Sequence, residues 1–173
     1  FLTRNIVGRP LKPPPVAVAF KNDEFDPSLT MREKVTHLTR DSACMSCHSV
    51  INPLGFSLEH FDAVGRWRPN EPSLPVHAGG EYTTEDGETV WLSGPRDVAR
   101  IAVTSEAAHR AFVDALFHHT VKQAAAAYDR DLLAKLREQF ADNQYSIRGV
   151  LLEIVYRQAI HGLAETDGTG EDT

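Results

Sequence analysis

The feature that most constrains this chain is a short motif that reads Cys44-Met45-Ser46-Cys47-His48. The chain contains two cysteines in all, and both belong to this motif. On an α-helix, residues three and four positions apart share one face, so both thiols and the imidazole would point the same way. This spacing is typical of the attachment site of a c-type haem, in which both thiols bond to the porphyrin and the imidazole ligates iron. We therefore expect one covalently attached haem c, with thioether bonds at Cys44 and Cys47 and with His48 as proximal axial ligand.

Two other kinds of site use a closely spaced cysteine pair. A structural zinc site usually needs four ligands, commonly from two such pairs, whereas this chain has one pair. A thioredoxin-like redox dithiol would follow a strand and would not require the histidine that comes directly after Cys47. Zinc binding and dithiol chemistry are therefore the alternatives to haem attachment.

Length, net charge and hydropathy limit the number of domains and the kinds of partner that we expect. The 173 residues suffice for one domain, or for one domain with a small appendage, that buries a core without disulfide bonds. The net charge of -6 disfavours nucleic acid or an anionic membrane surface as a partner, because both need a basic face. No apolar run approaches the roughly 18 residues that a membrane span requires, so we expect no membrane span.

The start of the chain and the haem motif both bear on where the protein resides. The sequence begins at Phe1 without a methionine or a signal peptide, which suggests a processed product or a piece of a longer protein. Covalent attachment of haem c takes place outside the cytoplasm. If haem is attached here, we expect an extracytoplasmic location, in the periplasm or on the cell surface.

The two ends of the chain differ in composition from the middle. Residues 1–29 are rich in proline, which removes backbone donors and favours extended structure, so we expect an extended arm. Residues 164–173 are acidic, small and glycine-bearing, which predicts a disordered tail. The prolines of the arm are Pro10, Pro13, Pro14, Pro15 and Pro27.

Residues 30–80 form the expected haem-attachment region. Thr30 and Glu33 fit a capping box, which predicts a helix of about ten residues. Asp41 or Ser42 is expected to cap a second, short helix that carries the cysteine motif. The Asn-Pro-Leu-Gly sequence at residues 52–55 is expected to end that helix, because proline disfavours a helical residue before it and glycine permits a reversal.

The remainder of the chain predicts one hairpin followed by helices. Residues 81–93 alternate around an Asp-Gly pair, which is a signal for a β-hairpin. Residues 94–163 show helical periodicity, and we expect this helical region to complete the haem pocket. The predicted fold class is therefore mainly α: a helical c-type cytochrome domain with a small β-hairpin insertion and an extended Pro-rich N-terminal arm.

The histidine pair His118-His119 is the main candidate for the distal side of the iron. Phe112, Leu116 and His119 recur at helical spacing, which places His119 on the stripe expected to face the core and His118 about 100° around the helix. One interpretation is an interior histidine beside an exposed one. The other makes His119, or else His118, the distal ligand or a distal acid-base group.

Two further sets of residues are candidates for contacts to the haem. Arg66 and Arg68 flank Trp67, and two guanidinium groups beside an apolar ring suit the two haem propionates, although a solvated basic turn explains them equally well. A carbonyl within residues 52–54 is expected to accept the Nδ1 proton of His48, which would fix the tautomer of the imidazole.

The chain from Thr30 onward combines several distinctive sequence segments. They comprise Thr30–Val35, Cys44–His48, Ile51–Glu59, Phe61–Arg68, Phe112–Val113, Leu116–His119, Val121–Gln123 and the closing helix from Ile147, with Gly8-Arg9-Pro10 upstream. This joint pattern resembles the C-terminal module of large planctomycete-type cell-surface cytochrome c proteins, which consist mostly of domains of unknown function. The resemblance implies a haem-bearing, exported C-terminal module with Cys44, Cys47 and His48 at the haem, in proteins often linked with polysaccharide handling.

These observations favour a mono-haem c-type cytochrome that acts in extracytoplasmic electron transfer as a C-terminal module or a subunit of a larger assembly. The expected partner is a redox protein, and we expect an electron carrier rather than an enzyme. The first alternative is a haem enzyme or gas sensor, peroxidase-like, with an open distal position where His119 or His118 acts as an acid or base. The second alternative is a structural subunit that is stapled by its haem.

Overall fold

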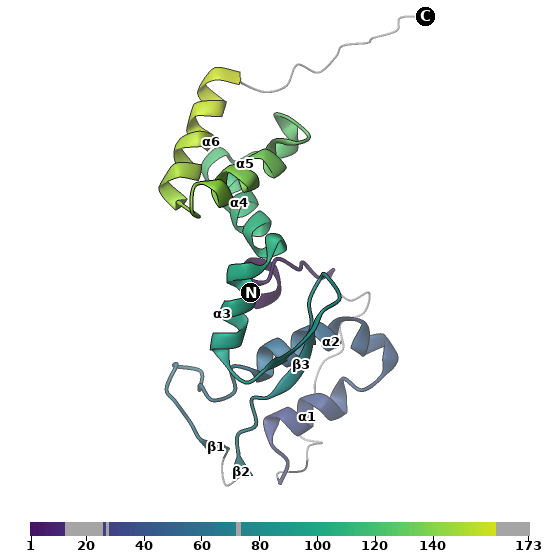
Figure 1. Ribbon diagram of the computed structural model, residues 1–173. Helices are drawn as coiled ribbons and strands as arrows, with labels where there is room; N and C mark the ends of the chain where they lie inside the picture. The colour runs from purple at the N-terminus through teal and green to yellow at the C-terminus, as the bar shows by residue number, and fades with distance from the viewer. Residues whose placement is uncertain (13–25, 27, 72–73, 162–173) are drawn as a thin grey trace, which may run out of the picture. The chain divides into compact units, whose positions relative to one another are not determined.

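The computed structural model describes residues 1–12, 26, 28–71 and 74–161, and Figure 1 shows a mainly helical chain with two small antiparallel β-ribbons. The mainly α fold class predicted from the sequence is confirmed. The chain divides into two compact units, Phe1–Ala107 and Ala108–Thr173, and each has its own hydrophobic core. Most of the predicted proline arm (residues 13–25 and 27) and the predicted acidic tail (164–173) lie outside the described residues.

The first seven residues are not extended. Leu2–Ile6 form a short π-helix, η1, which packs against α2 and α3 of the first unit. Val7, directly after it, is 3% exposed and belongs to the core of that unit. The prediction of an extended arm from residue 1 is therefore wrong for this segment, because the prolines begin only at Pro10 and do not prevent helical structure before it.

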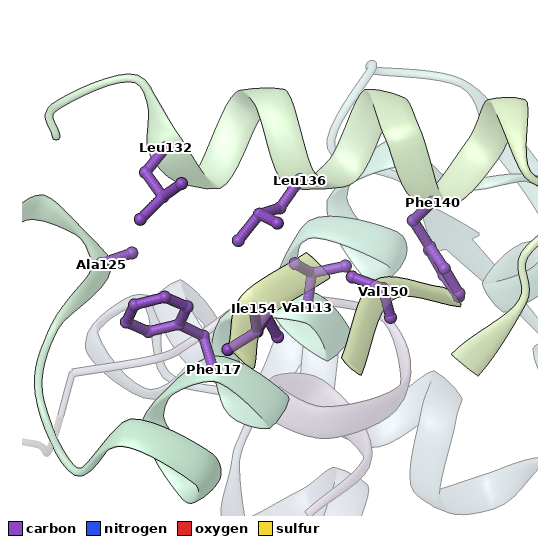
Figure 2. Close-up of a cluster of buried hydrophobic side chains, with 8 residues drawn as sticks. All are labelled: Val113, Phe117, Ala125, Leu132, Leu136, Phe140, Val150 and Ile154. Atoms are coloured by element: carbon purple, nitrogen blue, oxygen red, sulfur yellow. The ribbon is translucent and has the colours of Figure 1, made fainter. Parts of the chain in front are cut away.

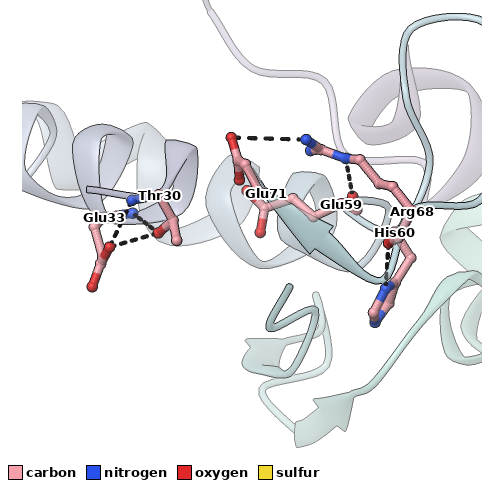
Figure 3. Close-up of polar contacts among 6 residues, drawn as sticks. All are labelled: Thr30, Glu33, Glu59, His60, Arg68 and Glu71. Carbon is pink, nitrogen blue, oxygen red and sulfur yellow. Dashed lines mark hydrogen bonds and ion pairs between the residues drawn. The ribbon is translucent and has the colours of Figure 1, made fainter. Parts of the chain in front are cut away.

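Helix α1 spans Met31–Leu38 and begins with the predicted capping box. The Glu33 backbone N–H donates to the Thr30 side chain, and the Thr30 backbone N–H donates to the Glu33 carboxylate over 2.7 Å, as Figure 3 shows. The Thr30 hydroxyl and the Thr30 backbone N–H both donate to the Glu33 carboxylate, and these two bonds lower the pKa of the Glu33 carboxyl. The capping box satisfies two donors at the start of α1.

Helix α2 spans Ser42–Phe56 and is longer than the sequence predicts, because Pro53 lies inside it. Pro53 lacks the N–H that would continue the helical bonding pattern, which normally disfavours an interior position. The neighbours of the proline hold the helix together here. Leu54 is 1% exposed in the core, and the Asn52 side chain bonds to both His48 and Thr39. Tertiary packing therefore overrides the expected helix end at residues 52–55.

The described part of the first unit contains two antiparallel ribbons. Strand β3 (Gly80–Thr83) pairs with β4 (Thr89–Leu92), which confirms the predicted hairpin within a residue of its expected bounds. Gly87 in its turn has φ 83°, a conformation that glycine adopts easily. A smaller ribbon of β1 (Asn70–Glu71) and β2 (Leu74–Pro75) was not predicted. Both strands of this ribbon are too short to give a periodic pattern.

Helix α3 spans Pro95–Thr104 and packs against β4 and η1, so it belongs to the first unit. The predicted single helical region of residues 94–163 is therefore divided between the two units. Helix α2 sits against η1, β3 and α1, and it contributes two side chains to the core. The buried core of this unit consists of Val7, Val50, Leu54, Tyr82, Leu92 and Val98.

In the described residues, the second unit contains most of α4 (Glu106–Val121), the 3-10 turn η3 (Ala125–Ala127), α5 (Leu132–Asp142) and α6 (Ile147–His161). Figure 2 shows its core, which consists of Val113, Phe117, Ala125, Leu132, Leu136, Phe140, Val150 and Ile154. Among the described residues, no helix combines the length and apolar character needed to cross a membrane.

Candidate functional site

The cysteine motif lies on the first two turns of α2. Cys44 and Cys47 are free thiols and half-buried, and His48 is half-buried beside them. Because these residues are helical, the two thiols and the imidazole share one face. Val50 and Leu54 lie about 60° and about 20° from Cys47 around the helix, and both are buried in the core. The core thus anchors α2 and leaves the motif at the surface of the first unit.

The face of α2 that carries the motif continues as an open surface. At about 100° per residue, Ile51 and Gly55 fall within the arc between Cys47 and His48. Ile51 is 38% exposed, and a Cβ added at Gly55 would meet no atom within 4 Å. Two free thiols and an oriented imidazole beside an exposed strip are the donor set that a c-type haem would use. In the part of the chain that the structure describes, no three His, Cys, Asp or Glu side chains group together as metal ligands.

A chain of hydrogen bonds fixes the orientation of the His48 imidazole. Its Nδ1 lies 2.8 Å from Oδ1 of Asn52, and Nδ2 of Asn52 donates to Oγ1 of Thr39 over 2.9 Å. The Thr39 hydroxyl in turn donates to the Val35 carbonyl oxygen over 2.8 Å. Since that hydroxyl proton is already used, Thr39 accepts from the Asn52 amide, and the Asn52 oxygen faces the imidazole.

This series of hydrogen bonds determines which nitrogen of the His48 imidazole is available to a ligand. An amide oxygen can only accept, so Nδ1 of His48 carries the proton and Nε2 keeps its lone pair. A bound metal ion would therefore meet Nε2. The acceptor that we expected within residues 52–54 is Asn52, through its side chain. His48 and Asn52 are four residues apart on one helix, which is a spacing from which the contact could have been predicted.

Arg66 is held in a turn by Asp62. Its Nε donates to Oδ2 of Asp62 over 2.8 Å, and the other carboxylate oxygen accepts from the backbone N–H groups of Val64 and Arg66. The hydrogen bonds from Arg66 and Val64 lower the pKa of the Asp62 carboxyl. The Arg66 side chain is 80% exposed. Its contact to a haem propionate stays a prediction, and Asp62 is a partner that the sequence analysis missed.

Arg68 also has partners within the first unit, which Figure 3 shows. Its Nε donates to the backbone carbonyl of Glu59 over 2.8 Å, and Nη1 lies 3.7 Å from Oε1 of Glu71. Burial and the nearby Glu71 charge raise the pKa of the Glu59 carboxyl, against the opposing charges of Arg32, Arg68 and His60. A propionate contact of Arg68 likewise stays a prediction.

The Trp67 side chain packs against two other rings, those of His60 and Phe61. Its ring stacks on the His60 imidazole, with centroids 4.2 Å apart and planes 13° apart, and the Phe61 ring meets it edge-on. Nδ1 of His60 lies 3.1 Å from the Arg68 carbonyl oxygen. Trp67 is nevertheless 61% exposed, so one face of the indole remains available to a partner or cofactor.

Both distal candidates lie in the second unit. His118 and His119 are exposed on α4, and the core face of that helix carries Val113 and Phe117 instead. The prediction that His119 faces the core is therefore wrong, because the buried stripe runs one position away from the expected Phe112–Leu116 stripe. Neither imidazole is buried in the core. The role of His119 or His118 as distal ligand stays a prediction.

The second unit also contains a cavity of about 320 Å³. Ion pairs at its rim join Lys135 to Asp129 and Arg157 to Glu153, each over 2.6 Å. Tyr128 accepts a hydrogen bond from Gln158 there. Its lining includes neither His118 nor His119, and consists of Phe117, Tyr128, Asp129, Leu132, Lys135, Arg157 and Gln158.

These features define a mainly helical chain whose second helix presents two free thiols and an oriented imidazole. Residues 1–71 match a family model described as PSCyt3, a protein of unknown function (DUF1588). That span contains the whole of α1 and α2 and the Arg66–Arg68 segment, and the family name agrees with the cytochrome resemblance at a coarse level. No curated protein and no solved structure matches the chain.

Proposed function

We propose that this chain is a mono-haem c-type cytochrome that transfers electrons outside the cytoplasm. The observation that carries this proposal is the arrangement at the start of α2. Two free thiols, Cys44 and Cys47, share a face with His48, whose Nδ1 is bonded to Asn52 so that Nε2 is available to iron. Ile51 and Gly55, which are exposed on the same face of α2, lie beside them.

The residues of α2 have separate tasks in this proposal. Each cysteine thiol adds across one porphyrin vinyl group, so that a carbon–sulfur bond forms and the S–H hydrogen moves to the neighbouring vinyl carbon. His48 would hold the iron through the lone pair of Nε2. The haem held by these residues would supply one-electron redox chemistry. Asn52 keeps the imidazole in the tautomer that this ligation needs.

The proposed cellular location follows from the chemistry of haem attachment. Haem c is attached after export, so the protein acts in the periplasm or on the cell surface. It works as a C-terminal module or subunit of a larger assembly and passes electrons to a redox partner protein. The match of residues 1–71 to PSCyt3 is compatible with this setting.

A visible spectrum tests the proposal. The chain is exported from cells that attach haem to cytochromes c, purified, denatured and mixed with alkaline pyridine. We expect the shifted absorption band of a haem that carries two thioether bonds. The Cys44→Ser, Cys47→Ser double variant should lose the band, whereas Met45→Leu, a change at an exposed position inside the motif, should keep it. Colourless protein, or zinc bound at the two thiols, would contradict the proposal.

The spectrum of the native protein separates electron transfer from catalysis. An electron carrier should be low-spin in both oxidation states and should not respond to cyanide or carbon monoxide. A high-spin ferric form that binds these ligands would instead favour a haem enzyme or gas sensor with an open distal position.

A further inference from the structure

We infer that Asn52 and Thr39 are positioning residues that set how strongly His48 donates electrons to iron, and thereby set the reduction potential. This inference rests on the proposed function. It concerns residues outside the Cys-x-x-Cys-His motif, and Thr39 comes from the end of a different helix, α1. The three side chains form one continuous chain of hydrogen bonds that ends at the Val35 carbonyl.

The acceptor at His48 is a side chain and can therefore be changed by substitution. An imidazole that donates Nδ1–H to a stronger acceptor becomes a better electron donor at Nε2, which favours ferric iron. Hydrogen bonding outside the ligands is one of the means by which a protein tunes a haem potential. The amide oxygen of Asn52, 2.8 Å from Nδ1, is in the position to do this.

Thr39 makes this arrangement rigid. It is 3% exposed, and its hydroxyl uses its proton on the Val35 carbonyl and accepts from Nδ2 of Asn52. Burial protects these bonds from competition with water, which strengthens them. Without the hydroxyl, the Asn52 amide would lose its anchor and could rotate away from His48. The C-terminal end of α1 is thus connected to the axial ligand through two side chains.

Substitutions at Asn52 should move the potential in opposite directions. Asn52→Asp places a charged acceptor at Nδ1, which should lower the potential. Asn52→Leu removes the acceptor, which should raise it. We expect a change of about tenfold in the ferric-to-ferrous ratio at fixed ambient potential for each variant, equivalent to about 59 mV for one electron. Ser49→Asp is the charge control, because it adds a carboxylate at an exposed position of the same helix.

Substitutions at Thr39 test the connection to α1. Thr39→Val should shift the potential in the direction of Asn52→Leu, by a smaller amount, and Thr39→Ser should restore it because it keeps the hydroxyl. Thr36→Val is the matched control, since it makes the same change at an exposed position of α1. Thr36→Val should leave the potential unchanged.

The experiment is redox titration of the purified haem-loaded chain, with helix content checked by circular dichroism. Opposite shifts for Asn52→Asp and Asn52→Leu, with rescue by Thr39→Ser, support the inference. Equal potentials in all variants that carry haem would overturn it and leave the proposed function standing. A wild-type chain without thioether-bound haem would overturn both.

Discussion

The Trp67 indole stacks on the His60 imidazole, with ring centroids 4.2 Å apart and planes 13° apart. The two residues lie on either side of a turn that is closed by a bridge between Phe61 and Trp67. Asp62 holds the same turn through three hydrogen bonds to Val64 and Arg66. The segment directly after α2 is therefore ordered by its own contacts.

The ring pair should contribute measurably to stability. We expect a double-mutant cycle of His60→Ala and Trp67→Ala to give a coupling of about 0.5 to 1.5 kcal/mol in the free energy of unfolding, because stacked rings add to the effect of area burial. Urea denaturation of the four proteins measures it. Losses that add within about 0.3 kcal/mol would show that the stacking contributes nothing.

Glu59 should make stability depend on pH. Burial and Glu71 raise the pKa of this carboxyl in the folded state above its ordinary value of 4.5. Between the two values the folded state binds more protons than the unfolded state, so this group lowers stability as pH rises through that window. Because Glu59 is only half-buried, solvent screening limits the effect to about 0.5 kcal/mol.

The Glu59→Gln variant tests this dependence. It should be more stable than the wild type at pH 7 and equally stable near pH 4, where both side chains are neutral. Thermal unfolding at the two pH values measures the difference. A stability gap that is the same at both pH values would show that the charge of Glu59 is not its cause.

Two glycines of the first unit should respond to alanine in opposite ways. Gly55 lies inside α2, and an added Cβ meets no atom within 4 Å, so Gly55→Ala should stabilise the haem-free chain by about 0.5 to 1 kcal/mol. Gly87 has φ 83°, so Gly87→Ala should destabilise by about 1 kcal/mol or more. Urea denaturation checks both. Changes of the same sign would contradict the local conformations described.

The visible spectrum of the haem-loaded chain should distinguish the roles of His118 and His119. If His119 is the distal ligand, His119→Ala should convert the low-spin spectrum of the haem-loaded chain to a high-spin one. His118→Ala should leave it unchanged. The reverse result would assign the role to His118. Spectra that neither change affects would remove both residues from the distal side.

Local signals in the sequence predicted local structure. The Thr30–Glu33 capping box and the Asp-Gly turn of the β3–β4 hairpin each depend on a few adjacent residues, and both are confirmed. The cysteine motif predicted a shared helical face, and α2 is helical throughout the motif. These features need no distant contact, which is why sequence alone sufficed for them.

Two predictions that depended on tertiary contacts were wrong. Pro53 does not end α2, because Leu54 is buried in the core and Asn52 bonds to Thr39 of the α1 end. His119 is exposed because the packing of α5 and α6 selects Val113 and Phe117 as the core face of α4. Which stripe of a helix is buried, and whether a proline is tolerated, were decided by partners that the sequence does not place.

The most direct test of the account is the mass of the peptide that carries residues 44–48. After proteolysis of the exported protein under denaturing conditions, the account predicts one peptide with the mass of a haem added at Cys44 and Cys47, and an intact chain heavier than its 19.2 kDa by the same amount. A peptide with two unmodified cysteines from protein produced in cells that attach haem would contradict the central claim.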